Sequence, residues 1–371
     1  MKIRLHTEDL KSALNKVLSV VDKRNSRPIL TYTLIETSNA QLNISATDLE
    51  VSSKVVINAE VDNPGRFCVN AKNIFDILKE LPGTEIELSL DDSSNTLKLN
   101  CGDIHYSLLI YKADDFPQLV FNQEVNKFKL SSEQLANIIN KTSYAVLNDE
   151  TRLYLNGIYL QEIDSKLRAV ATDGHRLSLL ETDLSESNNE TLINGIIIPR
   201  KGIFEIKKIS ETYPDTEIEL SVDDTFLYVN AKNEYFLSVR LIAREYPKYQ
   251  AVIPNKTTYT MTTDRNSFFD AIRRIKIMSN EKSNGVRLKL ADQTMTLTAN
   301  HPSLGDAMET MAVDYNGKEM EIGFNAKYLI DTLHSFDEGE ISLELNNELS
   351  PIIIKSNSLP NYLGIIMPLK L

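Results

Sequence analysis

The sequence has 371 residues, a formal net charge of −12, 42% hydrophobic residues and 25% charged residues, so it is globular and too long for one ordinary core. No apolar run approaches the roughly 18–20 residues of a membrane span, and charge begins at Lys2, where a signal peptide would need an apolar segment. Two cysteines, Cys68 and Cys101, are too few for a disulfide framework, and five scattered histidines lack metal-ligand spacing. We therefore expect a soluble, cytoplasmic chain with buried free thiols, no membrane contact, no metal and no cofactor.

The first ninety residues alternate strand and helix patterns. Helices are predicted where apolar residues recur every three or four positions, and strands where apolar and polar residues alternate. The predicted elements are strand 1–5, helix 7–21, strands 31–37, 41–47, 50–58 and 65–69, a helix ended by Pro82-Gly83, and strand 85–92. This order is β-α-β-β-β twice, which indicates antiparallel sheets with helices covering one face.

The same markers return twice more along the chain. EIELSLDD (85–92) is repeated as EIELSVDD (217–224) and EISLELNN (340–347), and VNAKNIFDIL (69–78) is repeated as IPRKGIFEIK (198–207) and FNAKYLIDTL (324–333). A spacing of about 120–130 residues is that of a domain and not of a solenoid unit. We predict an α+β chain of three homologous domains, at 1–122, 128–250 and 257–371, each a pair of β-α-β-β-β units.

The stretch ATDGHR (171–176) resembles catalytic chemistry. In that interpretation Asp173 orients His175 in a hydrolase-like site. No Ser or Cys nucleophile recurs beside it, the first repeat has Glu50 at the position of His175, and Asp-Gly is a common turn signal between strands. The pattern favours a polar hairpin turn, and no catalytic residue is assigned.

Charge divides between the helices and the strands. The six predicted helices with their flanks hold 17 Lys and Arg residues against 10 Asp and Glu residues, so the rest of the chain carries a net charge of −19. Basic helices without a base-reading motif suit contact with phosphates that is independent of sequence. Ordinary solvated helix surfaces would give a similar count.

Motifs throughout the chain resemble one family. They are YLNG (154–157), ATDGHRL (171–177), IPRKG (198–202), SNEK (279–282), MEIGFN (320–325) and MPLKL (367–371). Together with the threefold repeat, they resemble the bacterial DNA polymerase III β subunit, the ring-shaped processivity clamp. The resemblance implies two three-domain protomers joined head to tail around double-stranded DNA, with helices lining the ring and sheets outside.

The resemblance also implies site residues. DNA contacts would fall at Arg24, Lys72, Arg152 and Tyr154, to which charge alone adds Arg200 and Lys201. Asp149 and Leu153 depart from the family pattern of a polar amide and a Tyr. The seam between protomers would include Tyr106, Leu108, Ile277 and Met278.

A hydrophobic groove between the second and third domains would receive short peptides. Its residues would be Leu155, Thr172, Gly174, His175, Arg176, Leu177, Pro247, Val252, Asn325, Tyr328, Leu349, Ile365, Ile366, Met367, Pro368, Leu369, Lys370 and Leu371. Ala251 and Ser283 stand where the family more often has Arg and an aromatic residue. The implied peptide partners are the DNA polymerase III α subunit, the clamp loader, other DNA polymerases and repair proteins. A scaffold that binds proteins but no DNA is the remaining alternative.

Overall fold

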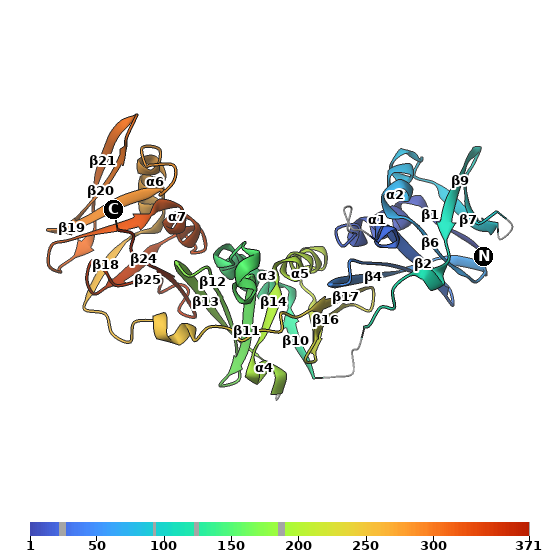
Figure 1. Cartoon of the computed structure of the whole chain (residues 1–371), viewed down its shortest axis with the longest axis horizontal. Helices are drawn as coiled ribbons and strands as arrows, with labels where there is room; N and C mark the ends of the chain where they lie inside the picture. Colours follow the sequence, from blue (N-terminus) through green and yellow to red (C-terminus); the bar gives the residue numbers. More distant parts are fainter. Residues whose placement is uncertain (22–26, 92–93, 122–125, 185–189, 371) are drawn as a thin grey trace. The chain divides into compact units, whose positions relative to one another are not determined.

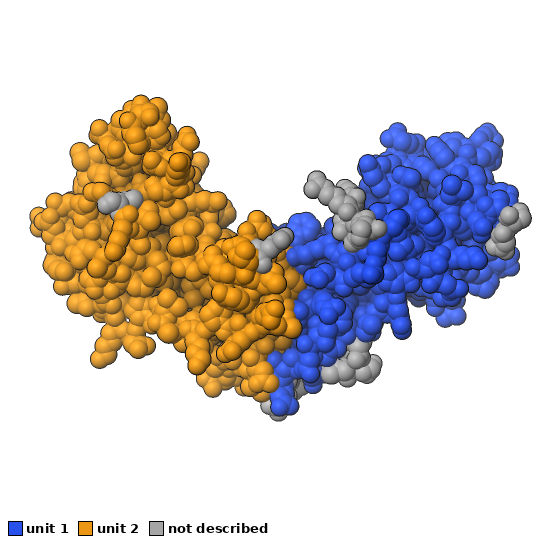
Figure 2. Space-filling view, in the orientation of Figure 1, with its two compact units in different colours: residues 1–135, 185–191, 201–241 blue, residues 136–184, 192–200, 242–371 orange. Residues whose placement is uncertain are grey.

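The computed structural model describes residues 1–21, 27–91, 94–121, 126–184 and 190–370. The chain forms two compact units, which Figure 2 colours separately. The first unit comprises residues 1–135, 185–191 and 201–241, and the second comprises residues 136–184, 192–200 and 242–371. The division passes through the middle repeat, so each half of that repeat belongs to a different unit.

Each repeat contains two β-α-β-β-β units, as the sequence predicts. The first repeat comprises β1 (Lys2–His6), α1 (Thr7–Val17), β2 (Tyr32–Ser38), β3 (Gln41–Thr47), β4 (Val51–Asn58), β5 (Glu60–Asn63), β6 (Arg66–Asn70), α2 (Ala71–Glu80), β7 (Glu85–Asp91), β8 (Thr96–Cys101) and β9 (Ile104–Tyr111). Strand β5 is an addition to the expected pattern. Helices α1 and α2 contact each other, and α1 packs on β3 and β4 (Figure 1).

The second and third repeats follow the same order of two β-α-β-β-β units, with one inserted element in each. The second comprises β10 (Lys127–Ser131), α3 (Ser132–Thr142), β11 (Gly157–Ile163), β12 (Lys166–Thr172), β13 (Arg176–Asp183), α4 (Glu190–Asn194), β14 (Ile196–Pro199), α5 (Arg200–Thr212), β15 (Glu217–Val222), β16 (Phe226–Ala231) and β17 (Tyr235–Arg240). The third comprises β18 (Tyr259–Asp264), α6 (Arg265–Lys276), β19 (Gly285–Ala291), β20 (Thr294–His301), β21 (Gly305–Ala312), β22 (Asp314–Tyr315), β23 (Met320–Asn325), α7 (Ala326–His334), β24 (Glu340–Leu345), β25 (Ile352–Lys355) and β26 (Tyr362–Ile366). The inserted elements are α4 before β14 in the second repeat and β22 before β23 in the third.

The first strand of each half pairs with the sheet of the other half. Strand β1 pairs with β7 and β6 with β2; the second repeat does the same with β10 on β15 and β14 on β11. The third repeat pairs β18 with β24 and β23 with β19. Because each half lends a strand to the other, neither half completes its sheet alone.

Neighbouring repeats share continuous sheets. Strand β17 pairs antiparallel with β4, from Tyr235↔Val55 to Val239↔Val51, within the first unit. Strand β13 pairs antiparallel with β26, from Arg176↔Ile366 to Leu180↔Tyr362, within the second unit. Backbone hydrogen bonds therefore join the first repeat to the second and the second to the third.

The helix ends follow from local sequence. Asn70, Asp264 and Asn325 are N-caps whose side chains accept backbone N–H groups of the first turn. Leu81 is extended, as the residue before a proline prefers, so Pro82 ends α2 as predicted.

The helix predicted over 7–21 is shorter, because α1 ends at Val17. The reason lies in tertiary contacts at its last turn. The carbonyl of Lys16 accepts hydrogen bonds from the Lys208 ammonium and the Tyr235 hydroxyl, and Val20 N–H turns back to the carbonyl of Val17.

Both cysteines are free and buried, as predicted. Burial raises the pKa of the Cys68 thiol to about 12, which makes it a poor nucleophile. Among the described residues, no helix is long and apolar enough to cross a membrane, and no group of three or more His, Cys, Asp or Glu side chains could hold a metal ion.

A polar contact joins the segment after α1 to the buried side chain of Glu205 in α5, within the first unit. The Ser19 hydroxyl donates to Glu205 Oε2 at 2.9 Å and accepts from the Lys208 ammonium at 2.9 Å. Glu205 has no exposed surface, and its Oε1 has no hydrogen-bond partner among the described residues. Burial is the main cause that raises the pKa of Glu205, against the opposing effects of Ser19 and of nearby Lys208 and Lys201. The ionised carboxylate is therefore a cost to the folded state.

Glu205→Gln should raise the melting temperature at pH 8, with the gain shrinking as the pH falls toward 4. A raised folded-state pKa stabilises the native protein fully below the unfolded pKa of about 4.3, and this contribution is lost as the pH rises through the folded pKa. Thermal unfolding across this pH range measures the effect. Glu211→Gln, on the exposed side of the same helix, is the matched control and should change little at any pH. A gain from Glu205→Gln that does not vary with pH would contradict the assignment.

Candidate functional site

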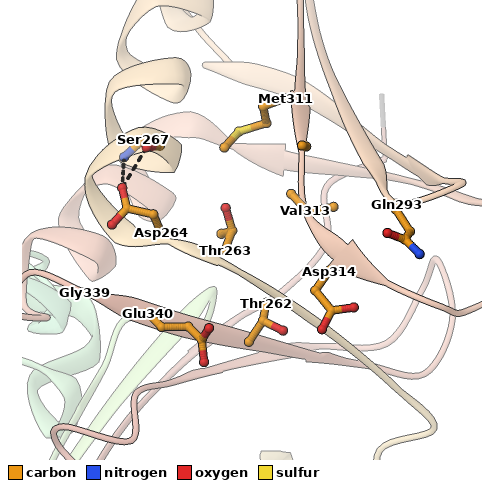
Figure 3. A pocket seen from close by; sticks show the side chains of 11 residues that line it. Thr262, Thr263, Asp264, Ser267, Gln293, Met311, Val313, Asp314, Gly339 and Glu340 are labelled. Atoms are coloured by element: carbon orange, nitrogen blue, oxygen red, sulfur yellow. Dashed lines mark hydrogen bonds between the residues drawn. The ribbon is translucent and has the colours of Figure 1, made fainter.

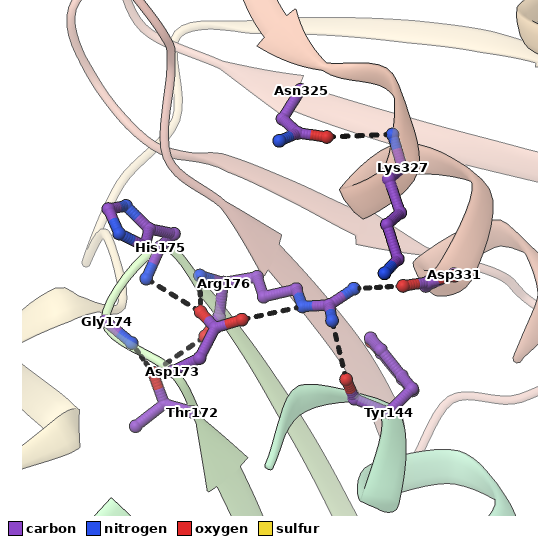
Figure 4. Close-up of polar contacts among 9 residues, drawn as sticks. All are labelled: Tyr144, Thr172, Asp173, Gly174, His175, Arg176, Asn325, Lys327 and Asp331. Carbon is purple, nitrogen blue, oxygen red and sulfur yellow. Dashed lines mark hydrogen bonds and ion pairs between the residues drawn. The ribbon is translucent and has the colours of Figure 1, made fainter. Parts of the chain in front are cut away.

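The ATDGHR stretch forms the turn of the hairpin between β12 and β13 (Figure 4). Asp173 Oδ1 accepts the backbone N–H groups of His175 at 2.9 Å and Arg176 at 3.1 Å. Thr172 Oγ1 accepts the N–H of Gly174, whose φ of +89° lies in the left-handed region that glycine tolerates. The turn is thus held by its own Asp and Thr side chains, as the turn hypothesis predicts.

Arg176 is the centre of the site. Its Nε donates to Asp173 Oδ2 at 3.0 Å, Nη1 to Asp331 Oδ2 at 2.6 Å and Nη2 to the Tyr144 carbonyl at 2.7 Å. The rings of Tyr144 and Tyr328 lie 5.2 and 4.6 Å from its Cζ. A buried guanidinium that meets two carboxylates and two rings is well compensated. The cluster connects the turn, α7 and the segment after α3.

This geometry does not support a catalytic elbow. Asp173 binds the backbone amide of His175 and the guanidinium of Arg176, while the imidazole stacks on the Tyr328 ring at 6.0 Å. Asp173 therefore orients Arg176, and its role is structural. Sequence reasoning missed Tyr144 and Asp331, because neither has a motif and both are distant in the chain.

The C-terminal segment lies beside the turn. The N–H of Met367 donates to the His175 carbonyl at 2.9 Å, and that of Leu369 donates to the Gly323 carbonyl at 2.8 Å. A cavity of about 470 Å³ borders this segment. Its lining is Arg287, Glu321, Gly323, Glu348, Leu349, Met367, Pro368, Leu369 and Lys370, of which the sequence reasoning had named the last five.

The predicted groove residues fall into two sets. Leu155, Leu177, Ile365 and Ile366 are buried in the core, the first three in one cluster with Tyr246 and Tyr249. The other described members are half-buried or exposed, apart from Arg176: Thr172, Gly174, His175, Pro247, Val252, Asn325, Tyr328, Leu349, Met367, Pro368, Leu369 and Lys370. Leu371 lies outside the described residues. The buried set belongs to the core, and the partly exposed set offers contact surface.

The structure also locates Ala251 and Ser283, the two departures from the family pattern near the predicted groove. Ala251 is exposed in a short 3-10 helix (Tyr249–Val252). Ser283 lines a cavity of about 730 Å³ with Arg287 and Met308, so its small side chain leaves this space open. Arg287 also lines the cavity at the C-terminal segment, which makes the two cavities neighbours.

A further cavity of about 600 Å³ lies at the N-terminus of α6 (Figure 3). Asp264, Asp314 and Glu340 are among its lining residues. Asp264 is the N-cap of α6 and accepts hydrogen bonds from Ser267 N–H and Oγ, which lower its pKa. No predicted groove residue lines this cavity.

The residues predicted to contact DNA differ in exposure and in whether their charges are already paired. Lys72 and Arg200 are exposed at the starts of α2 and α5. The Lys201 ammonium is already bound to Asp48 and to the Val20 carbonyl. Arg24 lies outside the described residues.

The loop before β11 holds the other two candidates. Arg152 Nε is 3.8 Å from Asp149 Oδ2, and the Arg152 side chain is 42% exposed. Tyr154 is half-buried against the core cluster, and Leu153 is exposed. Asp149, one of the departures, therefore partly neutralises Arg152.

The seam candidates lie on two apolar surfaces, one in each unit. Tyr106 is exposed and Leu108 half-buried on β9, where Leu109 is 79% exposed. Ile277 is 74% exposed after α6, Met278 is half-buried, and Met308 on β21 is 72% exposed. Sequence reasoning missed Leu109 and Met308, whose exposure no local pattern reveals.

The chain is built of three repeated α+β domains, with a cavity beside the C-terminal segment at the second junction. Models of the DNA polymerase III beta subunit match three parts: the N-terminal domain at residues 1–120, the central domain at 129–248 and the C-terminal domain at 250–370. A beta sliding clamp of Caulobacter vibrioides is 32% identical over 376 residues, covering both chains fully.

Solved structures of the same family also match this chain over its full length. The DNA polymerase III subunit beta of Pseudomonas aeruginosa matches with a TM-score of 0.94 at 29% identity, and a sliding clamp of Bartonella birtlesii bound to griselimycin matches with 0.94 at 30%; both cover the two chains fully. This chain belongs to the DNA polymerase III beta subunit family. Its function is that of a sliding clamp, a processivity factor in DNA replication.

Arg176→Ala should lower the free energy of unfolding by about 3–5 kcal/mol, because it leaves Asp173 and Asp331 without their buried countercharge. Urea unfolding followed by circular dichroism measures this loss. His175→Ala removes an exposed ring from the same turn and should change stability by less than about 0.5 kcal/mol. Equal stability of the Arg176→Ala variant and the wild type would show that the cluster does not hold this junction.

Proposed function

We propose that two copies of this chain close head to tail into a ring around double-stranded DNA and tether polymerases to it. The observation that carries this proposal is the full-length match of three clamp domains, which we delimit at 1–122, 128–250 and 257–371. The protein is a non-catalytic homodimer of the cytoplasm. Its mechanism is topological: an encircling ring slides, and a tethered polymerase gains effective concentration at the primer end.

The proposed seam joins β9 of one protomer to the region of Ile277, Met278 and β21 of the other. Strand β21 is the last strand of its sheet, and β9 pairs with β6 only at Tyr111 and Ile110. Both surfaces carry the exposed apolar side chains described above. Pairing of such edges between protomers would remove aggregation-prone surface, as ring closure does.

The proposed DNA contacts are Lys72, Arg152, Tyr154, Arg200, Lys201 and Arg24. Exposed cations at the starts of α2 and α5 support contact with phosphates and not with bases, as sliding requires. Lys201 is the weakest of these, because Asp48 neutralises its charge and Val20 fixes its ammonium.

The proposed peptide groove lies along the hairpin turn and the C-terminal segment, with all its described residues in the second unit. A buried apolar floor with a half-exposed rim that includes Met367 suits an anchor residue of a short peptide. The partners would be the DNA polymerase III α subunit, the clamp loader, other DNA polymerases and repair proteins carrying such a peptide.

The purified protein, once loaded on nicked circular DNA, should stay bound and should be lost when that DNA is linearised, because linkage to DNA is topological. Ile277→Asp should abolish retention by placing a charge in the proposed apolar seam. Gel filtration of the loaded DNA measures retention, and sedimentation at low concentration reports dimer or monomer. Equal retention on linear and circular DNA would contradict encirclement.

Deletion of residues 367–371 should abolish binding of a short peptide with Leu and Phe anchors while leaving the fold intact. Two described backbone hydrogen bonds of this segment would be lost, at about 1 kcal/mol each. Calorimetry measures peptide binding, and thermal unfolding checks the fold. The same peptide with its anchors changed to Ala is the control, and undiminished affinity after the deletion would contradict the groove.

A further inference from the structure

Three helices carry a phenylalanine at an equivalent position, and in two of them a cation lies over the ring. Phe75 in α2, Phe204 in α5 and Phe269 in α6 are each the fifth residue of their helix. None of the three is buried, and Phe204 is 61% exposed. A phenyl ring outside the core contributes less to the free energy of folding than a buried one, so burial alone does not explain why it recurs at this position.

Phe269 lies between two guanidinium groups. The Cζ of Arg265 is 4.7 Å from the centre of the Phe269 ring, and the Cζ of Arg273 is 5.7 Å from it. The three residues are four apart along α6, so they form one stripe of the helix. His334, the exposed last residue of α7, lies at 6.3 Å from the same ring.

Arg265 is held by two hydrogen bonds besides its contact with the Phe269 ring. Its Nε donates to the Leu333 carbonyl at 2.9 Å, and its Nη1 donates to Asn266 Oδ1 at 2.8 Å. These bonds and the ring fix the guanidinium plane and leave Nη2 with no hydrogen bond to the described residues.

The charge of Arg273 is only weakly neutralised by its neighbours. Its side chain is 64% exposed, and its nearest carboxylate in the described chain, Asp270, is 3.9 Å away and also exposed. The neighbouring Arg274 differs, because Glu309 binds its guanidinium at 2.5 Å and neutralises it. The stripe therefore presents guanidinium groups that no close carboxylate of the described chain neutralises.

Helix α2 in the first unit has a smaller version of this arrangement, with one cation over its ring. The Lys79 ammonium lies 4.4 Å from the centre of the Phe75 ring, and Lys72 precedes the ring by three residues. Asp76 also contacts Lys79 at 3.2 Å, so the pair is partly neutralised. The recurrence in a second repeat argues that a ring supporting cations is a feature of this chain and not an accident of α6.

We propose that Phe269 is a positioning residue for DNA, holding the guanidinium groups of Arg265 and Arg273 ready to donate to backbone phosphates, Arg265 through its Nη2. Stacking on a ring restricts a guanidinium while leaving its N–H edges free, so less side-chain entropy is lost when a phosphate binds. This inference rests on the proposed function, since it requires that the helices meet DNA.

The test measures binding of the full-length dimer to a short fluorescent DNA duplex by anisotropy at several NaCl concentrations. Phe269→Leu should weaken binding roughly two- to five-fold, the factor that a cation–π contact represents, and Phe269→Tyr should retain wild-type affinity. Arg273→Ala should make the salt dependence shallower by about 0.9, one phosphate contact, and its effect should be smaller in the Phe269→Leu background.

A merely structural role of Phe269 would not make its effect depend on Arg273. Unchanged affinity of a folded Phe269→Leu variant, or an effect of Arg273→Ala that is the same in both backgrounds, would overturn the inference. Lys72→Ala is measured in parallel. If Lys72→Ala weakens binding and Phe269→Leu does not, only this inference fails; if the wild type itself does not bind duplex, the proposed function fails.

Discussion

The structure depends on backbone pairing between strand edges. Every half repeat has a sheet that is completed by a strand from the other half, and every repeat continues into its neighbour by pairing of β17 with β4 or of β13 with β26. Unpaired strand edges would expose N–H and C=O groups that invite aggregation. Strand β21 ends its sheet, and β9 pairs with β6 at only Ile110 and Tyr111 in the described chain. Both strands carry exposed apolar residues, which the proposed second copy would cover.

Each junction between repeats also contains a buried charge, and the two are compensated differently. Arg176, at the second junction, meets two carboxylates, a carbonyl and two rings, so its charge is fully used in fixing the turn beside the C-terminal segment. Glu205, beside the first junction, leaves one oxygen without a partner in the described chain. A satisfied charge fixes one geometry, whereas an unsatisfied one weakens the state that buries it. The proposed peptide groove lies at the junction with the satisfied charge.

Much of the fold could be predicted from local sequence. The period of the apolar residues, the Pro82-Gly83 stop and the Asp173-Gly174 turn all correspond to observed elements. The limit of α1 could not be predicted, because Lys208 and Tyr235, nearly two hundred residues away, take the carbonyl group of Lys16. For the candidate site, the sequence identified the turn and the tail, but Tyr144 and Asp331 escaped because they bind Arg176 only through the tertiary fold.

By itself the sequence determined the secondary structure, the threefold repeat and the family, since each depends on the identity and spacing of neighbouring residues. Only the tertiary structure decided which strands exchange between half repeats and which cations are free. Lys201 and Arg274 look like free surface charges in the sequence, yet Asp48 and Glu309 neutralise them. Arg273, on the same helix as Arg274, has only a 3.9 Å contact with the exposed Asp270 among the described residues. The reason is that a charge acts on whatever lies within a few ångströms of it, and such neighbours are set by folding and not by order along the chain.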